Sequence, residues 1–185
     1  MNHIQSTPTI ARADRALPVR IREAQPEDAA DLIAYFRRVF AEPGINLITE
    51  ADEFAPTVET ESRLIRDFAR MTNSLFLVAE SNGQIVGQLT LEGGKRRNVR
   101  HSAVLGITVA RDWRGQGIGR RLIEHAIRWA RDGRLLTRIE LHVFARNEGA
   151  IHLYQALGFE LEGRRRRAVI RDGEPLDDLV MGLLL

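Results

Sequence analysis

The spacing of hydrophobic residues along the chain changes repeatedly, and each change marks the border of a predicted element. Apolar residues recur every three or four positions in four segments, which predicts amphipathic helices near residues 26–40, 58–71, 114–131 and 147–157. Apolar or alternating runs predict strands near residues 19–21, 75–79, 85–89, 103–110, 139–143, 159–170 and 176–184. The resulting order, β-α-α-β-β-β-α-β-α-β-β, predicts a single α+β (mixed α/β) domain.

Apolar spacing and capping residues assign faces and ends to these helices. In the second helix, Leu64, Ile65 and Phe68 are expected to face inward. Asn147 is a favourable N-cap for the fourth helix, and Gly158 is a suitable C-terminal stop. The inward face of the third helix is expected to comprise Leu122, Ile123, Ala126, Ile127 and Ala130.

Two segments lack any apolar period. Residues 1–17 are interpreted as a flexible N-terminal tail, which leaves 18–185 as the folded domain. Residues 42–57 form a long connection between the first two helices, and loops of that length inside a compact domain are often functional. The last residues, 179–185, are interpreted as a core strand whose edge could pair with a second copy, so a homodimer is a possible assembly.

Composition excludes several classes of protein. The 185 residues are 44% hydrophobic and 28% charged, which is typical of a globular domain, and no apolar run is long enough for a membrane-spanning helix. The N-terminus carries no apolar signal core, so a cytoplasmic location is expected. Because the chain has no cysteine, disulfides, thiolate metal sites and a cysteine nucleophile are excluded.

The charge balance argues against nucleic-acid binding. The 27 basic residues are nearly matched by 25 acidic ones, which leaves a net charge of +2. The run Arg164 to Arg167 lies in a predicted strand, where alternate residues face opposite sides, and no aromatic residues interleave with it. A solvated strand is the preferred interpretation of this run.

A glycine-rich segment joins the strand 103–110 to the third helix. In Arg114-Gly115-Gln116-Gly117-Ile118-Gly119, the glycines let backbone N–H groups at the helix start approach an anion closely. The helix dipole adds roughly half a positive charge there. The spacing fits neither a P-loop nor a complete dinucleotide fingerprint. The segment therefore predicts a phosphate site, with a glycine-rich turn that binds nothing as the alternative.

Two motifs together resemble the GCN5-related N-acetyltransferase (GNAT) superfamily. Arg114, Gly117 and Gly119 satisfy that family's signature of Arg or Gln, two residues, Gly, one residue, and Gly or Ala. The second family element corresponds to Asn147, Tyr154 and the Leu157-Gly158-Phe159 sequence. The resemblance covers residues 75–184 well and the first seventy only in element order. It implies one GNAT-like domain with a central, mostly antiparallel sheet and about four helices.

The resemblance also implies roles for named residues, with acetyl-CoA as co-substrate and no metal. The pyrophosphate is expected on the backbone of Arg114, Gly115, Gln116, Gly117, Ile118 and Gly119. The strand segment Ile107, Thr108 and Val109 is expected to hydrogen-bond the pantetheine arm, although Ile107 and Val109 could equally be core residues. Asn147 is expected near the cofactor. Tyr154 is expected to protonate the departing thiolate, with a plain core tyrosine as the alternative.

The base that deprotonates the amine is less well defined by the sequence. Ribosomal-protein alanine acetyltransferases have a glutamate five residues before the motif asparagine, whereas this chain has His142 there. Imidazole can gain and lose a proton near neutral pH. Glu140 shares the same strand face and is a second candidate, with Glu92 and His101 behind it. Each of them could instead be a surface polar residue, and a water chain could take the proton.

The acceptor is expected to be a primary amine. Residues 42–61 contain six acidic residues and no Lys or Arg, and an acidic rim on the acceptor side would attract a cationic amine. A solvated acidic loop is the alternative. The six acids are Glu42, Glu50, Asp52, Glu53, Glu59 and Glu61. The expected activity is acetyl transfer from acetyl-CoA to a small amine, amino acid or peptide N-terminus by direct attack in a ternary complex. The alternative is a non-catalytic acyl-CoA-binding domain of the same fold.

Overall fold

A computed structural model describes residues 18–185, so the predicted N-terminal tail lies outside the described residues. The described part of the chain contains seven strands and four α-helices in the predicted order. These are β1 (Arg20–Glu23), α1 (Ala29–Phe40), α2 (Val58–Arg70), β2 (Leu75–Ser81), β3 (Gln84–Gly93), β4 (Ser102–Val109), α3 (Ile118–Gly133), β5 (Arg138–Phe144), α4 (Glu148–Ala156), β6 (Glu160–Arg171) and β7 (Glu174–Leu184). Short 3₁₀ turns precede α1, β4 and the glycine-rich segment.

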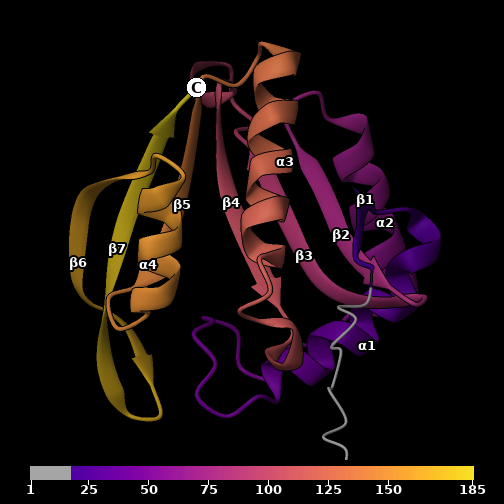
Figure 1. Cartoon of the computed structure of the whole chain (residues 1–185), viewed down its shortest axis with the longest axis horizontal. Helices are drawn as coiled ribbons and strands as arrows, with labels where there is room; N and C mark the ends of the chain where they lie inside the picture. Colours follow the sequence, from indigo (N-terminus) through magenta and orange to yellow (C-terminus); the bar gives the residue numbers. More distant parts are fainter. Residues whose placement is uncertain (1–17) are drawn as a thin grey trace, which may run out of the picture.

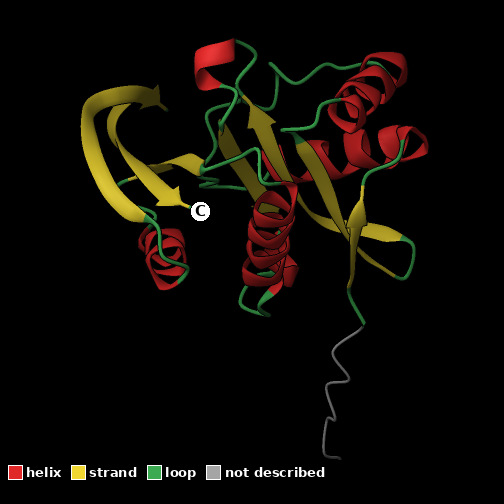
Figure 2. Cartoon of the chain, turned by 90° about the horizontal axis from the view of Figure 1, so that it is seen from above, coloured by secondary structure: helices red, strands yellow, loops and turns green. Residues whose placement is uncertain are grey.

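The strands form one mixed sheet in the order β1-β2-β3-β4-β5-β7-β6. Every neighbouring pair is antiparallel except β4 and β5, which run parallel. A parallel pair needs a crossover connection, and here α3 supplies it. Helices α3 and α4 cover one face of the sheet and α1 and α2 the other, as Figures 1 and 2 show. The predicted α+β class and its mostly antiparallel sheet are confirmed.

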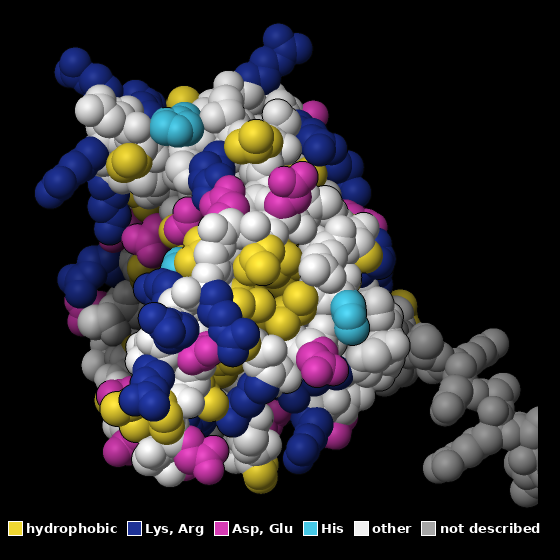
Figure 3. Space-filling view, turned by 90° about the vertical axis from the view of Figure 1, so that its left-hand side faces the viewer, with side chains coloured by type: hydrophobic (Ala, Val, Ile, Leu, Met, Phe, Trp, Pro, Cys, Tyr) yellow, Lys and Arg dark blue, Asp and Glu magenta, His cyan; other side chains and the backbone are white. Residues whose placement is uncertain are grey.

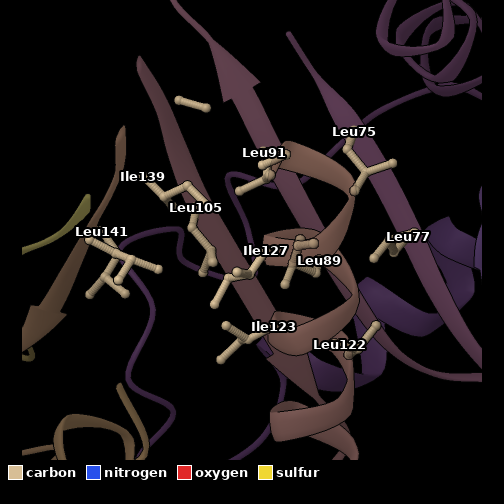
Figure 4. Packing of buried hydrophobic residues seen from close by; sticks show 14 of the residues in the cluster. Leu75, Leu77, Leu89, Leu91, Leu105, Leu122, Ile123, Ile127, Ile139 and Leu141 are labelled. Carbon is tan, nitrogen blue, oxygen red and sulfur yellow. The ribbon is translucent and has the colours of Figure 1, made fainter. Parts of the chain in front are cut away.

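The main core lies between α3 and the sheet. The predicted inward face of α3 is buried at all five positions, and it packs on leucines and isoleucines of β2 to β5 (Figure 4). Leu89, Leu122, Ile123 and Ile139 have no exposed surface. A second apolar cluster joins α1 and α2 to the opposite face. The site described below is thus built on elements that are fixed by packing on both faces of the sheet.

Three side chains depart from the predicted burial pattern. Leu64 is 44% exposed and Glu61 only 6% exposed, because the inward stripe of α2 runs through Glu61, Ile65 and Phe68. Burial raises the pKa of the Glu61 carboxyl. Tyr35 was not expected in the core, yet it is fully buried on α1, three residues after Leu32.

The C-terminal residues form a core strand as predicted, but β7 does not lie at an edge of the sheet. It pairs with β5 on one side and β6 on the other. The expectation that residues 179–185 offer a free edge is therefore wrong, and β6 is the edge strand at this end. Among residues 18–185, no helix combines the length and apolar character that crossing a membrane requires.

Candidate active site

The parallel strands β4 and β5 separate from each other halfway along their length. Their pairing ends at Leu105 and Leu141, although β4 continues to Val109 and β5 to Phe144. On its other edge, β4 stays paired with β3 as far as Val109. Beyond Leu105, the edge of β4 that faces β5 therefore has backbone groups outside the sheet ladder. A ligand with amide groups can hydrogen-bond to such an edge as an added strand would.

A cavity of about 570 Å³ lies where the two strands part. The two predicted motifs meet in its wall, together with the end of β4 and the loop after α1. Ten of the residues predicted from the sequence line it: Ile107, Thr108, Val109, Arg114, Gly115, Gly117, Ile118, Gly119, Asn147 and Tyr154. Gln116 does not, because its side chain turns back and donates to the Asp112 carbonyl at 3.0 Å.

The glycine-rich segment has the conformation that an anion site requires. Gly115 and Gly117 have φ values of +73° and +76°, in the left-handed region that glycine adopts without strain. Gly117 is also the N-cap of α3. A Cβ atom at either glycine would meet no other atom within 4 Å, so the backbone there is open toward a ligand. The residues present fit a phosphate group at the positive end of the α3 dipole.

The side chain of Arg114 is held by the protein. Its Nε donates to the Val109 carbonyl at 2.8 Å, and its Nη2 forms an ion pair with Glu42. The other oxygen of Glu42 accepts the backbone N–H of Arg111 at 3.0 Å. Glu42 therefore joins the end of α1 to the glycine-rich segment. The sequence could not indicate this contact, because the two residues are 72 positions apart.

Tyr154 reaches the cavity from α4. The residue is 7% exposed, and its ring packs against Phe159 with centroids 5.9 Å apart. Burial raises the pKa of its phenol to about 12. No residue between 18 and 185 forms a hydrogen bond with the hydroxyl, although the hydroxyl is not sealed in the core. Asn147 begins the same helix, and its Oδ1 accepts the Ala150 N–H at 3.4 Å, as the predicted cap should.

His142 and Glu140 lie together on β5, on the face opposite its core residues. The Nδ1 of His142 is 2.9 Å from Oδ2 of Asp178, a carboxylate with only 1% of its side chain exposed. The Nε2 is 3.6 Å from Glu140, which also pairs with Arg138. His142 is the first β5 residue beyond the last pair with β4. Neither His142 nor Glu140 lines the cavity itself.

The two reserve candidates for the base lie away from this cluster. Glu92 forms an ion pair with Lys95 at 3.3 Å, near the opposite end of β3 from the cavity. His101 precedes β4, and its carbonyl accepts the Thr137 N–H. Neither residue lines the cavity.

The loop after α1 borders the cavity through neutral residues, so the predicted acidic rim is largely wrong. Gly44, Ile45, Asn46 and Leu47 line the wall, and none of the six acids does. Glu42 binds Arg114, Glu61 is buried and Glu50 pairs with Arg171 at 3.1 Å.

Two arginines from distant elements hold this loop against the cavity. Arg171, at the end of β6, is only 9% exposed and donates to the Leu47 carbonyl as well as to Glu50. Arg146, just before α4, donates from Nε to Oδ1 of Asn46 at 2.9 Å. In Figure 1 the loop accordingly lies between the two halves of the sheet.

In the run Arg164 to Arg167, the side chains of the first two arginines pair with acids of the neighbouring strand. Arg164 bonds to Asp177 at 2.7 Å, and Arg165 bonds to Asp178 at 2.9 Å. Arg167 has a φ of +51° within a shift of register, so the expected alternation is interrupted by a bulge. Figure 3 shows the basic side chains of this side of the molecule interspersed with acidic and apolar ones.

Comparisons with known proteins agree with this geometry. The family model described as the acetyltransferase (GNAT) family matches residues 44–159. The L-amino acid N-acetyltransferase AaaT of Escherichia coli is 36% identical over 105 residues, which are 57% of this chain and 65% of AaaT. The matched region thus spans slightly less than two thirds of that relative.

Solved structures share the whole fold. The GNAT-family acetyltransferase of Streptococcus pneumoniae superposes with a TM-score of 0.87 and 36% identity, covering 91% of this chain and 100% of that one. The yncA protein of Salmonella typhimurium, solved with its cofactor acetyl-CoA, has a TM-score of 0.79 at 20% identity. That match covers 90% of this chain and 94% of that one.

Proposed function

The chain belongs to the GNAT acetyltransferase family, and on this premise we propose that it transfers an acetyl group from acetyl-CoA to a primary amine. The observation that carries the proposal is the parting of β4 from β5 at Leu105 and Leu141. The glycine-rich segment and Tyr154 line one cavity at this point. An elongated molecule with a phosphate at one end and amide groups along its length fits that arrangement.

The residues of the cavity suit acetyl-CoA end to end. Backbone N–H groups from Gly115 to Gly119 would hold the pyrophosphate. On the open edge of β4, the backbone of Ile107 and the N–H of Val109 would hold the pantetheine amides, since the Thr108 backbone pairs with β3. When bound, acetyl-CoA supplies the acetyl group as an activated thioester. The yncA structure, which has the same fold, contains acetyl-CoA. Direct attack by the amine in a ternary complex is consistent with the absence of cysteine.

Two protons must move during transfer, and the chain has a candidate for each. The Tyr154 hydroxyl, protonated and free of other hydrogen bonds within residues 18–185, would give its proton to the departing thiolate. His142 would take the proton of the amine at Nε2, because its Nδ1–H donates to Asp178. A water molecule would have to bridge from the cavity to His142. Glu140, 3.6 Å from Nε2, is the second candidate.

We further propose amino acids as the first acceptor class to test. AaaT, with 36% identity, is named for acetylation of L-amino acids. The acids expected to attract a cationic amine are paired, buried or outside the cavity wall, so they no longer favour a cationic acceptor. Thiol release from acetyl-CoA with a panel of amino acids, polyamines and peptide N-termini tests the proposal. Binding of acetyl-CoA without thiol release for any amine would instead support the non-catalytic acyl-CoA-binding alternative.

The charge of Glu42 should support cofactor binding without touching the cofactor. We expect Glu42→Gln to weaken acetyl-CoA binding roughly three- to tenfold, since an ion pair that fixes the loop is worth about 1 kcal/mol. Isothermal titration calorimetry measures the change. Glu59→Gln, an exposed acid of α2 outside the cavity wall, serves as the control and should leave the affinity unchanged. Equal affinities for the Glu42 variant and wild type would contradict this positioning role.

His142 should affect turnover rather than cofactor affinity. We expect His142→Gln to lower kcat about a hundredfold at neutral pH, because a positioned base typically contributes that much. The difference in kcat between the variant and the wild type should shrink as the pH rises, because more of the amine substrate is then already deprotonated in solution. Steady-state rates between pH 6.5 and 9.5 measure this convergence. A variant with wild-type kcat throughout that range would exclude His142 as the base and direct attention to Glu140.

The assembly and the cellular location stay predictions. We propose that a homodimer would form through the exposed edge strand β6, on which Ile170 is 73% exposed. Gel filtration at micromolar concentration distinguishes one copy from two. We keep the cytoplasm as the proposed location, and fractionation of cells that express the full chain tests it.

A further inference from the structure

Four parts of the chain form the wall of the cavity. Three of them have a proposed role toward acetyl-CoA: the end of β4, the glycine-rich segment with the start of α3, and α4 with Tyr154. The fourth is the loop after α1, residues 44–47. This loop continues from α1, which covers the sheet face opposite α3 and α4 (Figure 1). The loop is thus the part of the wall that is left for the acceptor.

The loop has little backbone structure of its own. Within residues 18–185, its N–H groups bond to the chain at Ile45 and again at Glu50, but at none of the four positions between. Ile48, in this stretch, is 63% exposed. A segment with few backbone hydrogen bonds and exposed apolar residues opens easily. Its position therefore depends on side chains that reach it from other elements.

Arg171 provides the most buried of these contacts. It is the last residue of β6 and pairs with Glu174 across the two-residue turn Asp172-Gly173. Both turn residues have positive φ, 52° and 79°, as in the tight turns that match the twist of a hairpin. The hairpin therefore presents the Arg171 side chain, which is only 9% exposed, from a defined backbone position.

The guanidinium of Arg171 makes two contacts with the loop at once. Its Nη1 donates to the Leu47 carbonyl, and its Nη2 donates to Glu50 at 3.1 Å. Strand β6 belongs to the half of the sheet beyond the parting of β4 and β5, whereas the loop starts from α1. Arg171 therefore connects the loop to the part of the fold on the other side of the cavity. A planar fork can serve both acceptors, which a lysine ammonium cannot do with the same geometry.

We propose that Arg171 is a positioning residue for the acceptor, because it holds residues 44–47 in the arrangement that binds the amine. This inference rests on the proposed acetyl transfer. Arg171 does not line the cavity itself, so it acts through Leu47 and Glu50. If the loop is docked in only a fraction of the molecules, the apparent affinity for the acceptor falls in proportion to that fraction. The rate at saturating acceptor and the affinity for acetyl-CoA are then retained.

The experiment uses the amine that the wild-type protein acetylates best. We expect Arg171→Gln to raise KM for this amine about tenfold, with kcat and the Kd of acetyl-CoA within about twofold of wild type. Hydrogen exchange of the backbone amides of residues 46–49 should become faster. Arg171→Lys should give an intermediate KM, because it keeps the charge but loses the fork.

Glu50→Gln tests the same contact from the loop side. The Glu50 side chain is 41% exposed, so its replacement should leave the fold intact and raise KM about threefold. This effect should disappear in the Arg171→Gln background, since the two residues act through one contact.

Two control variants should keep the wild-type KM. Arg164, on the same strand, also pairs with a carboxylate, that of Asp177, but its side chain is 62% exposed and neither residue lines the cavity. Arg164→Gln thus removes an arginine of β6 without releasing the loop. Asp52→Asn removes an acidic charge two residues after Glu50 and tests whether charge alone explains the effect of Glu50→Gln.

The inference is overturned if Arg171→Gln and Glu50→Gln both keep the wild-type KM. An equal loss of acetyl-CoA affinity would also overturn it, because the loop would then belong to the cofactor site. If melting shows that Arg171→Gln is unfolded, Arg171→Lys and Glu50→Gln decide in its place. Failure of the proposed function is distinct, because the wild-type protein would release no thiol with any amine. Hydrogen exchange of residues 46–49 would still show whether Arg171 holds the loop.

Discussion

Replacing Tyr154 with phenylalanine should lower kcat roughly a thousandfold while leaving the affinity for acetyl-CoA unchanged. General acid catalysis by a positioned side chain contributes about 10²–10⁴-fold, and the departing thiolate needs one proton for each turnover. Tyr154 lines the cavity, and its hydroxyl forms no competing hydrogen bond within residues 18–185. Phenylalanine keeps the ring and its contact with Phe159, so the fold and the cofactor site should persist.

The pKa of Tyr154 strengthens this expectation. Burial raises it to about 12, so the neutral, proton-donating form is the populated one through the whole physiological range. Because the pKa is raised, loss of the phenol proton should limit the rate only in strongly alkaline solution, near pH 12. Activity should thus not decline between pH 7 and 9 on account of Tyr154.

The other tyrosine provides the matched control. Tyr35 is also buried, but it lies outside the cavity wall, so Tyr35→Phe should lower kcat less than about tenfold. Stopped-flow detection of the released thiol, together with calorimetry of acetyl-CoA binding, separates chemistry from binding. Tyr154 would not be the acid if Tyr154→Phe kept the wild-type kcat. The same conclusion would follow if its affinity for acetyl-CoA fell by the same factor as its kcat.

Much of the fold could be predicted because its determinants are local. The apolar residues of α3 recur with the helical period from Leu122 to Ala130, and every predicted inward position is buried. Gly117 and Gly158 mark helix ends with positive φ, which glycine adopts most readily. The error at Leu64 has the same local origin, since two adjacent apolar residues leave the phase of a helix ambiguous by one position.

The parts of the site that escaped prediction depend on contacts between distant segments. Arg171 meets Glu50 across 121 positions, and Arg114 meets Glu42 across 72. Such pairs arise from the register of the sheet and from the path of a loop, and neither has a periodic signature in sequence. The acidic segment 42–61 therefore suggested an open acidic rim, whereas in the fold Glu42 and Glu50 pair with arginines and Glu61 is buried.

For Tyr35, the sequence could indicate burial but not the residue that its side chain contacts. Its spacing from Leu32 and Val39 was compatible with burial, but nothing in the sequence linked it to Thr108, 73 positions away. The contact of His142 with Asp178 could not be predicted either, because the two residues are distant in sequence. Strand β7 pairs with β5 only after the chain has passed through α4 and β6. Candidate residues could be named from motifs, whereas their orienting partners could only be found in three dimensions.

Replacing Gly117 with valine should weaken acetyl-CoA binding by at least roughly a hundredfold. Gly117 has φ +76° and ψ +3° at the N-cap of α3, a conformation that a β-branched residue adopts only with strain of about 1–3 kcal/mol. The new side chain would also project into the open space above the loop, where the pyrophosphate is proposed to meet backbone N–H groups. Each charge-assisted hydrogen bond lost there is worth about 1.5–3 kcal/mol, and about 1.4 kcal/mol corresponds to tenfold in affinity.

Gly133 at the other end of the same helix is the control. A Cβ there meets no atom within 4 Å, and its φ is not in the left-handed region, so Gly133→Ala should bind acetyl-CoA normally and melt at the same or a slightly higher temperature. Calorimetric titration of both variants, with thermal melts in parallel, separates a lost anion site from a damaged helix. If Gly117→Val kept wild-type affinity, the backbone of this segment could not be the main phosphate contact, and Arg120 or Arg121 beside it would be the next candidates.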